Sequence, residues 1–243
     1  MNILVVVPTR NGASWIKDNM TVVAQQTIND FKCVIVDDCS DDNSVSVINE
    51  IVAADNRFSL IVNDYRLGPL FARFAVPKSI CSSNTLVITI DGDDRLSDIF
   101  VFDKIVNAFK LGNLVIYGKM QVVSRGERGV IYGNDYPDKV KIDRSYRDSE
   151  WVCGQPRCFA SSLLKYIDEE KYLKLEGKWI TAATDKALFY CLMELARTRV
   201  YFIDEVLYEY YWNPNQHTDS NLQDKYSAVL RQMKPLGIDY VGW

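Results

Sequence analysis

Several features that mark other classes of protein are scarce in this sequence of 243 residues. Histidine occurs once, as His217, and none of the six cysteines belongs to a Cys-x-x-Cys pair. A zinc site is therefore not indicated, because such sites need clustered thiolates and imidazoles. Cysteines without a pairing pattern fit reduced thiols, which are typical of cytoplasmic proteins.

An excess of positive charge is also missing. The 28 basic residues are outnumbered by 32 acidic ones, for a net charge of −4. This balance argues against binding of nucleic acid or of an anionic membrane, although it leaves room for a local basic pocket around a small phosphate ligand. No apolar run approaches the roughly 20 residues that span a bilayer. No basic segment precedes the apolar start of the chain, so we expect no signal peptide and no transmembrane segment. The expected protein is cytoplasmic, with peripheral membrane contact at most.

Short apolar runs are plentiful, and hydrophobic residues make up 48% of the chain, enough for a packed core. The β-branched runs predict buried strands at residues 3–7, 33–36, 58–62, 86–90 and 114–118. Helical spacing of apolar residues lies between the first four of these runs. We therefore predict an α/β fold with a mostly parallel central sheet and helices on both of its faces.

The second half of the chain is less regular. Residues 122–150 are charged and indicate strands and long loops, whereas Thr184 is expected to cap a helix. Two short strands are predicted at residues 200–203 and 206–211, followed by an amphipathic stretch from residue 221. The chain shows no internal repeat or linker, so residues 1–243 are expected to form a single domain.

Polar side chains follow the predicted strands where each strand ends. Thr9, Arg10 and Asn11 follow the first strand, Asp37 and Asp38 the second, and Asp91 the fourth. Ligands of open α/β sheets bind beyond the carboxyl ends of the strands, so we expect these side chains to face one crevice.

The segment Asp91-Gly92-Asp93-Asp94 places three carboxylates within four residues at the end of a buried strand. Carboxylates this close repel one another and resist burial, and a hard divalent cation relieves both problems. Mn²⁺ or Mg²⁺ bridging a diphosphate is the favoured interpretation, and a solvated acidic turn that caps the next helix is the alternative.

At this point the sequence resembles glycosyltransferase family 2, whose GT-A fold enzymes use nucleotide-diphospho sugars. The resemblance rests on an ordered set: residues 5–12 with Pro8, residues 34–42, Asn63 with Gly68 to Arg73, residues 90–94, and Thr184-Asp185. Single matches of this kind are weak, whereas the order of the five is specific. The resemblance implies a GT-A domain, with residues 1–120 binding the nucleotide sugar and residues 121–243 binding the acceptor.

The resemblance also implies roles for residues. Asp38 would recognise the base, expected to be uracil, with Asp37 nearby, and Arg73 would contact the nucleotide. Asp91 would approach the ribose or sugar, and Gly92 lies in the same motif. Asp93 would bind the metal with Asp94 assisting. Asp185 would act as general base toward the acceptor hydroxyl, and the reaction would invert the anomeric centre.

Further candidates come from the second half of the chain. His217 falls where the family often has a histidine that completes the metal or diphosphate site. The segment from Trp151 to Phe159 falls where the family builds its sugar and acceptor pocket. There Trp151 is a candidate platform for a sugar ring, Gly154 for close substrate approach, and Arg157 for a phosphate or carboxylate of donor or acceptor. Packing in the core and surface exposure are the alternatives for these residues.

Other functions fit the sequence less well. A phosphatase of the haloacid dehalogenase type also places Asp-x-Asp after a buried strand, but Arg95 stands where its motif usually continues with Thr or Val. A sugar nucleotidyltransferase would need a glycine-rich loop after the first strand. A catalytically degenerate GT-A scaffold that binds sugars or partners is the remaining alternative, against which the retained Asp93, Asp185 and Arg73 argue.

Overall fold

A computed structural model describes residues 1–82, 84–212 and 220–236. In this part of the chain one sheet of nine strands runs through the molecule, in the order β3-β2-β1-β4-β8-β6-β11-β5, with β7 paired to β6. The strands are β1 Asn2–Thr9, β2 Lys32–Asp37, β3 Phe58–Val62, β4 Thr85–Thr89, β5 Arg95–Leu96, β6 Val115–Ser124, β7 Glu127–Tyr132, β8 Arg157–Ala160 and β11 Val200–Tyr211. A separate hairpin joins β9 Lys174–Leu175 to β10 Lys178–Trp179.

The sheet is parallel where the apolar runs predicted it. β1 lies between β2 and β4 and is parallel to both, and β3 adds a further parallel strand beside β2. β8 reverses direction, because it pairs antiparallel with both β4 and β6. The predicted α/β fold with a mostly parallel sheet is thereby confirmed, and strands from both halves of the chain belong to the same sheet.

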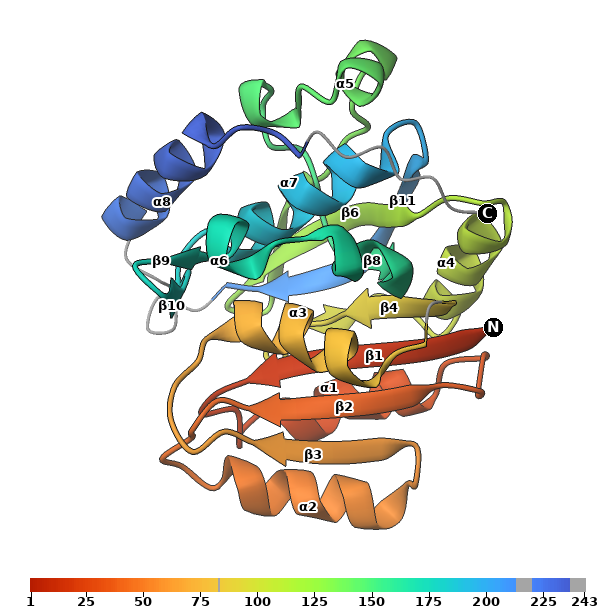
Figure 1. The fold of residues 1–243 in the computed structure, drawn as a ribbon. Coiled ribbons are helices and arrows are strands. Elements are labelled where there is room, and N and C mark those ends of the chain that lie inside the picture. The colour runs from red at the N-terminus through yellow and green to blue at the C-terminus, as the bar shows by residue number, and fades with distance from the viewer. Residues whose placement is uncertain (83, 213–219, 237–243) are drawn as a thin grey trace.

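Helices cover both faces of this sheet (Figure 1). They are α1 Ile16–Ala24, α2 Ser44–Ala54, α3 Pro69–Ile80, α4 Val101–Lys110, α5 Asp138–Asp143, α6 Glu169–Tyr172, α7 Thr184–Ala196 and α8 Ser220–Gln232, with 3₁₀ turns at Tyr146–Asp148 and Ser161–Tyr166. None of the described helices is long and apolar enough to span a membrane.

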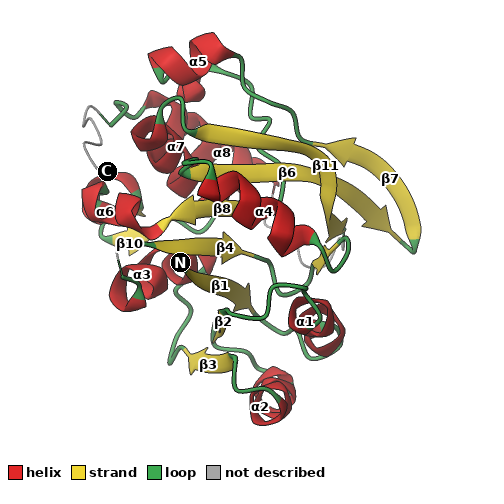
Figure 2. Cartoon of the chain, turned by 90° about the vertical axis from the view of Figure 1, so that its right-hand side faces the viewer, coloured by secondary structure: helices red, strands yellow, loops and turns green. Residues whose placement is uncertain are grey.

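Alternation along β1 explains the two layers. Leu4 and Val6 join a core with α3, α7 and α8, whereas Ile3, Val5 and Val7 join a core with α1, α2 and α4. Successive side chains of a strand point to opposite faces, so a strand covered on both sides must be apolar at every position. Figure 2 shows the helices on the two sides of the sheet and the β6–β7 hairpin projecting beyond them.

Two local expectations are wrong. Residues 200–211 form the single strand β11, which continues through irregularities after Ile203 and Val206, rather than two short strands. Thr184 does not cap α7; Ala183 precedes the helix in a left-handed conformation and makes no side-chain cap. The Thr184 hydroxyl instead accepts a hydrogen bond from Arg73 Nη1 at 3.1 Å, so the tertiary contact replaces the local one.

A buried ion pair ties the C-terminal helix to the domain. Arg147 and Glu194 are 2% and 0% exposed, and their Nε and Oε1 atoms lie 2.6 Å apart. Arg147 Nη1 also donates to the carbonyl of Leu230 in α8 at 2.7 Å, and the Leu236 N–H donates to Glu194 at 3.0 Å. The pair therefore joins α7 to the end of α8 at Leu230 and to the segment after it at Leu236.

We expect Arg147→Met to lower the free energy of unfolding by about 3–5 kcal/mol, since removing one partner leaves the other charge buried without compensation. Lys17→Met is the control, because Lys17 pairs with Glu50 at 3.0 Å on the surface, where such pairs contribute less than about 1 kcal/mol. Urea denaturation followed by circular dichroism measures both. Equal losses in the two variants would contradict the expectation.

Candidate active site

The carboxyl ends of β1, β2 and β4 border a cavity of about 800 Å³. The strand ends are joined there by backbone hydrogen bonds: the Asp38 N–H donates to the Thr9 carbonyl at 2.9 Å and the Gly92 N–H to the Pro8 carbonyl at 3.1 Å. The predicted site residues that line the cavity are Pro8, Thr9, Arg10, Asp38, Gly68, Arg73, Asp91, Asp93, Asp94, Arg157 and Asp185. Residues from strand ends and from the start of α7 therefore meet around one space, as the crevice rule leads one to expect.

The carboxylates of Asp93 and Asp94 are buried beside other negative charges. Burial, followed by the charge of Asp91, raises the pKa of Asp93 to about 6. Burial also raises the pKa of Asp94, with the charges of Asp93 and Asp91 adding to the effect. Asp94 accepts the Tyr211 N–H at 2.8 Å through Oδ1, but its buried Oδ2 has no hydrogen-bond partner among the described residues.

This pair fits a divalent cation by its chemistry. A hard cation prefers carboxylate oxygen, and it would take the unpartnered Oδ2 of Asp94 as a ligand while offsetting the repulsion between the carboxylates. In residues 1–82, 84–212 and 220–236 no group of three or more His, Cys, Asp or Glu side chains is arranged to hold a metal. A cation at Asp93 and Asp94 would therefore need further ligands, which diphosphate oxygens can provide.

Asp91 is held by three groups and differs from its neighbours in this respect. Its carboxylate pairs with Arg73 Nη2 and accepts Gln155 Nε2 at 3.2 Å, and its N–H donates to the Tyr208 hydroxyl at 2.9 Å. The guanidinium of Arg73, 8% exposed, also donates to Thr184. Arg73, expected to contact the nucleotide, thus lines the cavity while it joins the end of β4 to the first turn of α7.

Gly92 does not line the cavity, and its role in the motif is packing. A Cβ at this position would lie 2.7 Å from the Thr9 side chain, too close for any other residue without rearrangement. Its carbonyl also accepts a hydrogen bond from the Asn19 side chain at 2.9 Å. The glycine therefore lets the turn between Asp91 and Asp93 lie directly on the end of β1.

Asp37 and Asp38 are adjacent in the sequence but lie in different surroundings in the structure. Asp38 lines the cavity, and its carboxylate accepts hydrogen bonds from Asn63 Nδ2 at 3.0 Å, from the Leu67 N–H at 2.8 Å and from the Gly68 N–H at 3.0 Å. It thereby fixes the loop after β3, where Gly68 has the positive φ of 82° that glycine adopts most readily. Asp37 is fully buried and away from the cavity, and its carboxylate accepts the Ser40 N–H at 3.0 Å.

Arg10 and Asn11, which follow β1, also have different surroundings. Arg10 lines the cavity, pairs with Asp41 at 3.7 Å, and has a buried Nε without a partner among the described residues. Asn11 has a φ of 53°, and its side-chain oxygen accepts the Asp41 N–H at 3.0 Å. Asn11 therefore braces the loop after β2, whereas Arg10 remains at the cavity.

Asp185 occupies the first turn of α7 and lines the same cavity as the Asp91–Asp94 segment. Its Oδ2 lies 3.1 Å from Nη2 of Arg157, whose side chain is 8% exposed against 28% for Asp185. Burial by itself would lower the pKa of the Arg157 guanidinium, but the neighbouring Asp185, Cys153 and Asp91 raise it above its usual value. Arg157 thus pairs with a carboxylate of the protein itself, rather than standing free for one on a substrate.

Two of the expected acceptor residues lie behind the cavity wall. Trp151 is half-buried and packs edge-on against Tyr190, with ring centroids 5.3 Å apart. A Cβ on Gly154 would lie 2.4 Å from the carbonyl oxygen of Gly118 and 3.1 Å from that of Tyr132. Gly154 therefore permits close approach of protein backbone, where the sequence suggested approach of a substrate.

We expect Gly154→Ala to destabilise the fold by about 1–3 kcal/mol, because its Cβ must displace backbone rather than a flexible side chain. Gly129→Ala is the matched control, since a Cβ there would lie an ordinary 3.6 Å from the Val122 carbonyl. Thermal melts of both variants measure the difference. A Gly154→Ala protein as stable as Gly129→Ala would contradict this account of the backbone contact.

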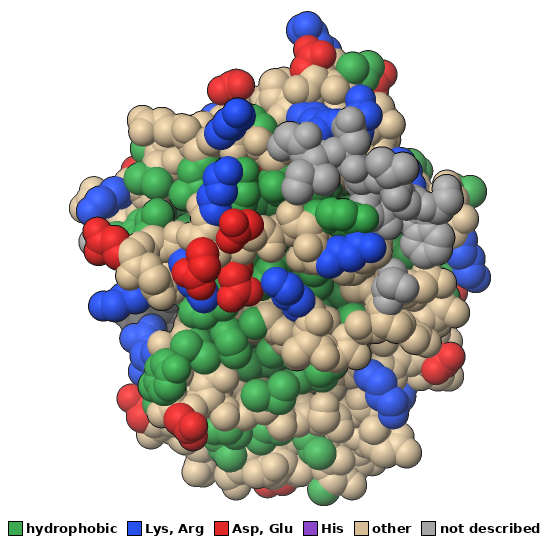
Figure 3. Space-filling view, viewed as in Figure 1, with side chains coloured by type: hydrophobic (Ala, Val, Ile, Leu, Met, Phe, Trp, Pro, Cys, Tyr) green, Lys and Arg blue, Asp and Glu red, His purple; other side chains and the backbone are tan. Residues whose placement is uncertain are grey.

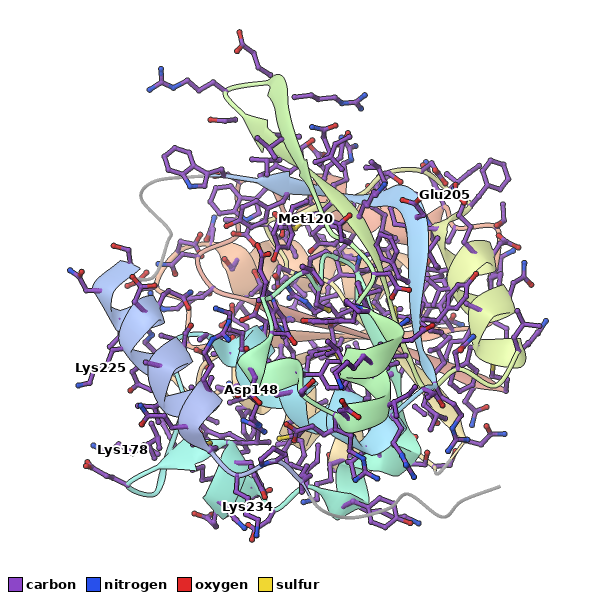
Figure 4. The ribbon with its side chains drawn as sticks, turned by 90° about the horizontal axis from the view of Figure 1, so that it is seen from above. Met120, Asp148, Lys178, Glu205, Lys225 and Lys234 are labelled. Atoms are coloured by element: carbon purple, nitrogen blue, oxygen red, sulfur yellow. The ribbon has the colours of Figure 1, made fainter. Side chains whose placement is uncertain are left out.

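Several cavity residues carried no signal in the sequence. They are Trp15, Arg66, Met120, Thr181, Ala182, Ala183, Tyr210 and Gln223. Met120 lies on β6 in the interior of the view in Figure 4, whereas Lys225 points outward from α8. Gln223 reaches the cavity from α8 and accepts the Ala183 N–H at 2.6 Å. The predicted metal ligand His217 lies outside the described residues.

On the outer surface, hydrophobic and charged side chains occupy different regions (Figure 3). On the face shown in Figure 3, hydrophobic side chains gather below α3, over β2 and β3, while acidic and basic side chains are mixed in the upper part. Ile61 and Val62 of β3, at 36% and 50% exposed, are the large apolar side chains that the structure leaves open in that strand.

A mostly parallel sheet covered by helices, with carboxylates at the strand ends around one cavity, defines an α/β protein of the GT-A type. The sequence model described as Glycosyl transferase family 2 matches residues 4–166. Because this match covers more than half of the 243 residues, the chain belongs to glycosyl transferase family 2, a family of sugar-transferring enzymes. A search of the curated proteins finds no match.

Solved structures agree on the fold. S. aureus TarS residues 1–349 in complex with UDP-GlcNAc superposes with a TM-score of 0.67 at 20% identity, over 95% of this chain and 66% of that one. The TarS 1–349 structure superposes at 0.65 and 21% identity, over 87% of this chain and 60% of that one. Mannosyltransferase PcManGT from Pyrobaculum calidifontis, in complex with GDP-Man and Mn²⁺, gives 0.61 at 16% identity, over 95% and 62%. The chain thus spans about 60% of the first TarS structure.

Proposed function

We propose that this protein transfers a sugar from a nucleoside-diphosphate sugar to a hydroxyl acceptor, with inversion at the anomeric carbon. The observation that carries the proposal is that Asp185 lines the same cavity as Asp91, Asp93 and Asp94. A carboxylate that can take a proton and a carboxylate pair that fits a cation are the two groups that such a displacement needs on opposite sides of the reacting carbon. Family membership supports the same reaction class.

In the proposed reaction the acceptor oxygen attacks the anomeric carbon while Asp185 takes the hydroxyl proton. The bond from that carbon to the diphosphate oxygen breaks, and its electrons leave with the diphosphate. A divalent cation, Mn²⁺ or Mg²⁺, would neutralise charge on the leaving diphosphate, with Asp93 and Asp94 as its protein ligands and His217 as a candidate third. Arg73 and Gln155 hold Asp91, which would face the ribose or the sugar.

The donor is proposed to be a UDP-sugar, bound between the end of β1 and the loop after β3. Pro8, Thr9, Arg10, Asp38 and Gly68 line that part of the cavity. Arg10 can stack on a base or pair with phosphate, because a guanidinium has a flat face and a fork of donors. One structural neighbour was solved with UDP-GlcNAc and another with GDP-Man, and both ligands belong to the proposed donor class.

The experiment that tests this function supplies the protein with a panel of nucleotide sugars, including UDP-GlcNAc and GDP-mannose, with Mn²⁺ and a set of carbohydrate acceptors. Formation of a glycosylated product of inverted configuration, together with release of the nucleoside diphosphate, is the expected result. A protein that binds nucleotide sugars but transfers none of them would instead be the degenerate scaffold considered from the sequence.

A further inference from the structure

Two buried polar side chains beside the cavity contact the carboxylates of the proposed reaction. Gln155 and Arg157 are 5% and 6% exposed, and they reach Asp91 and Asp185 respectively. We propose that Gln155 and Arg157 are positioning residues, with Gln155 setting the carboxylate of Asp91 on the donor side and Arg157 that of Asp185 on the acceptor side. The inference rests on the proposed function, since it assigns how two of its carboxylates are held.

The guanidinium of Arg157 is fixed on several sides. Nη2 donates to the Cys153 carbonyl at 3.2 Å as well as pairing with Asp185 at 3.1 Å. Its carbon lies 5.6 Å from the Trp151 ring centroid and 5.9 Å from that of Phe189. A side chain locked in this way can hold the partly exposed carboxylate of Asp185 in one orientation, which a solvated partner could not do.

Gln155 and Arg73 contact different oxygens of the Asp91 carboxylate. Gln155 Nε2 donates to Asp91 Oδ2 at 3.2 Å, while Arg73 pairs with Oδ1 of the same carboxylate. The two oxygens of Asp91 are thereby assigned to different partners, one from α3 and one from the segment before β8. Rotation of the carboxylate would break both contacts at once.

The segment that carries both side chains is set by its neighbours in the sheet. Arg157 pairs with Thr89 of β4 on one side and with Tyr117 of β6 on the other, and the Thr89 hydroxyl donates to the Arg157 carbonyl at 2.8 Å. Gly154 lies against the Gly118 carbonyl, where a Cβ would come within 2.4 Å. Because β4 leads into Asp91 and β8 begins at Arg157, the motif and the segment that positions it lie at the ends of two hydrogen-bonded strands, which fixes their separation.

A purely stabilising role does not account for these residues. Gln155 Oε1 and Arg157 Nε are buried without a hydrogen-bond partner among the described residues. Unsatisfied buried polar atoms cost stability and are few in native proteins, where a catalytic role, strain, or a bound water or ion accounts for them. Asp94 Oδ2 and Arg10 Nε, which belong to the same cavity lining, complete this set of unpartnered atoms around the site.

The test measures the effect on each carboxylate separately, through Arg157 for Asp185 and through Gln155 for Asp91. With whichever of UDP-GlcNAc or GDP-mannose the wild-type protein turns over in Mn²⁺, Arg157→Met is expected to lower kcat about 100-fold, the scale of a 1 Å misplacement. Its affinity for UDP with Mn²⁺ is expected to stay within about twofold of wild type. Arg157→Lys should recover part of the rate. Gln155→Met should instead weaken binding of UDP with Mn²⁺ about tenfold, the scale of one hydrogen bond to a charged group.

Lys141→Met is the matched control for loss of a buried cation. Lys141 is 9% exposed and pairs with the half-exposed Asp135 at 2.7 Å, and neither residue lines the cavity. This variant should keep the wild-type kcat. A double variant, Arg157→Met with Asp185→Asn, should be no slower than Asp185→Asn by more than about twofold, because coupled residues are not additive.

A kcat of Arg157→Met within twofold of wild type, or full additivity in the double variant, would overturn the positioning role. A second readout needs no turnover: crystal structures of wild type and Arg157→Met should differ in the position of the Asp185 carboxylate by more than about 0.5 Å. An unmoved carboxylate would overturn the inference. If the carboxylate moves in a protein that transfers no sugar, the positioning role stands and the proposed function fails.

Discussion

Asp185→Asn is expected to lower the rate of sugar transfer by a factor of about 10² to 10⁴, the usual contribution of a general base. Asparagine keeps the shape of the side chain and its place in the first turn of α7, but it cannot take the acceptor proton. Binding of UDP with Mn²⁺ should change by less than about twofold, because the carboxylate acts on the acceptor. Product formation and titration calorimetry measure the two quantities.

Asp18→Asn is the control for the alternative role, in which Asp185 only stabilises the start of a helix. Asp18 occupies the first turn of α1, is exposed, and does not line the cavity. Charge in the first turn of a helix is worth about 0.3–1 kcal/mol, and Asp18→Asn should show a loss of this size in thermal melts. Asp185→Asn should lose more, because it leaves the buried guanidinium of Arg157 without its counter-charge. If Asp185→Asn transferred sugar as fast as Asp18→Asn, the assignment of the base would be wrong.

Removal of the metal is expected to weaken nucleotide binding by at least about tenfold, or about 1.4 kcal/mol. Asp93 and Asp94 lie side by side, and burial raises the pKa of each. Without a cation, the carboxylates of Asp93 and Asp94 would lie beside the diphosphate either charged and uncompensated or protonated. Calorimetry with UDP, in Mn²⁺ and then in excess chelator, measures the difference.

Asp93→Asn should abolish that difference, so that UDP binds the variant equally with and without Mn²⁺. Asp64→Asn is the control, because Asp64 is an exposed carboxylate in the loop after β3 that does not line the cavity. The control should keep the full dependence on Mn²⁺. Equal affinity of the wild-type protein in Mn²⁺ and in chelator would remove the metal from the proposal.

Local sequence patterns were sufficient for the parallel strands of the first half of the sheet. Ile3 to Val7 are apolar at every position, and the structure buries them between two helical layers. Polar residues at the strand ends predicted a common crevice, and Asp38, Asp91 and Asp185 do line one cavity. Such patterns work because burial on both faces and the direction of parallel strands constrain the residue types at each position.

The same patterns could not tell which of two adjacent side chains faces the cavity. Asp37 and Asp38 are adjacent and chemically identical, yet one is buried in a turn with Ser40 and the other borders the cavity. Gly154 was expected to face a substrate and instead meets the backbone of Gly118. A one-residue change of position along an extended segment reverses the direction of the side chain, and neighbouring strands decide which direction is open.

The sequence by itself determined the layered sheet, the acidic segment at the end of its fourth strand and membership in the family, because these depend on runs of adjacent residues. Only the tertiary structure decided which side chains meet. Arg73 pairs with Asp91 and also donates to Thr184, 111 residues away along the chain, and Arg157 reaches Asp185 from a strand of the opposite direction. Contacts of this kind depend on how strands align and helices pack, so no local pattern records them.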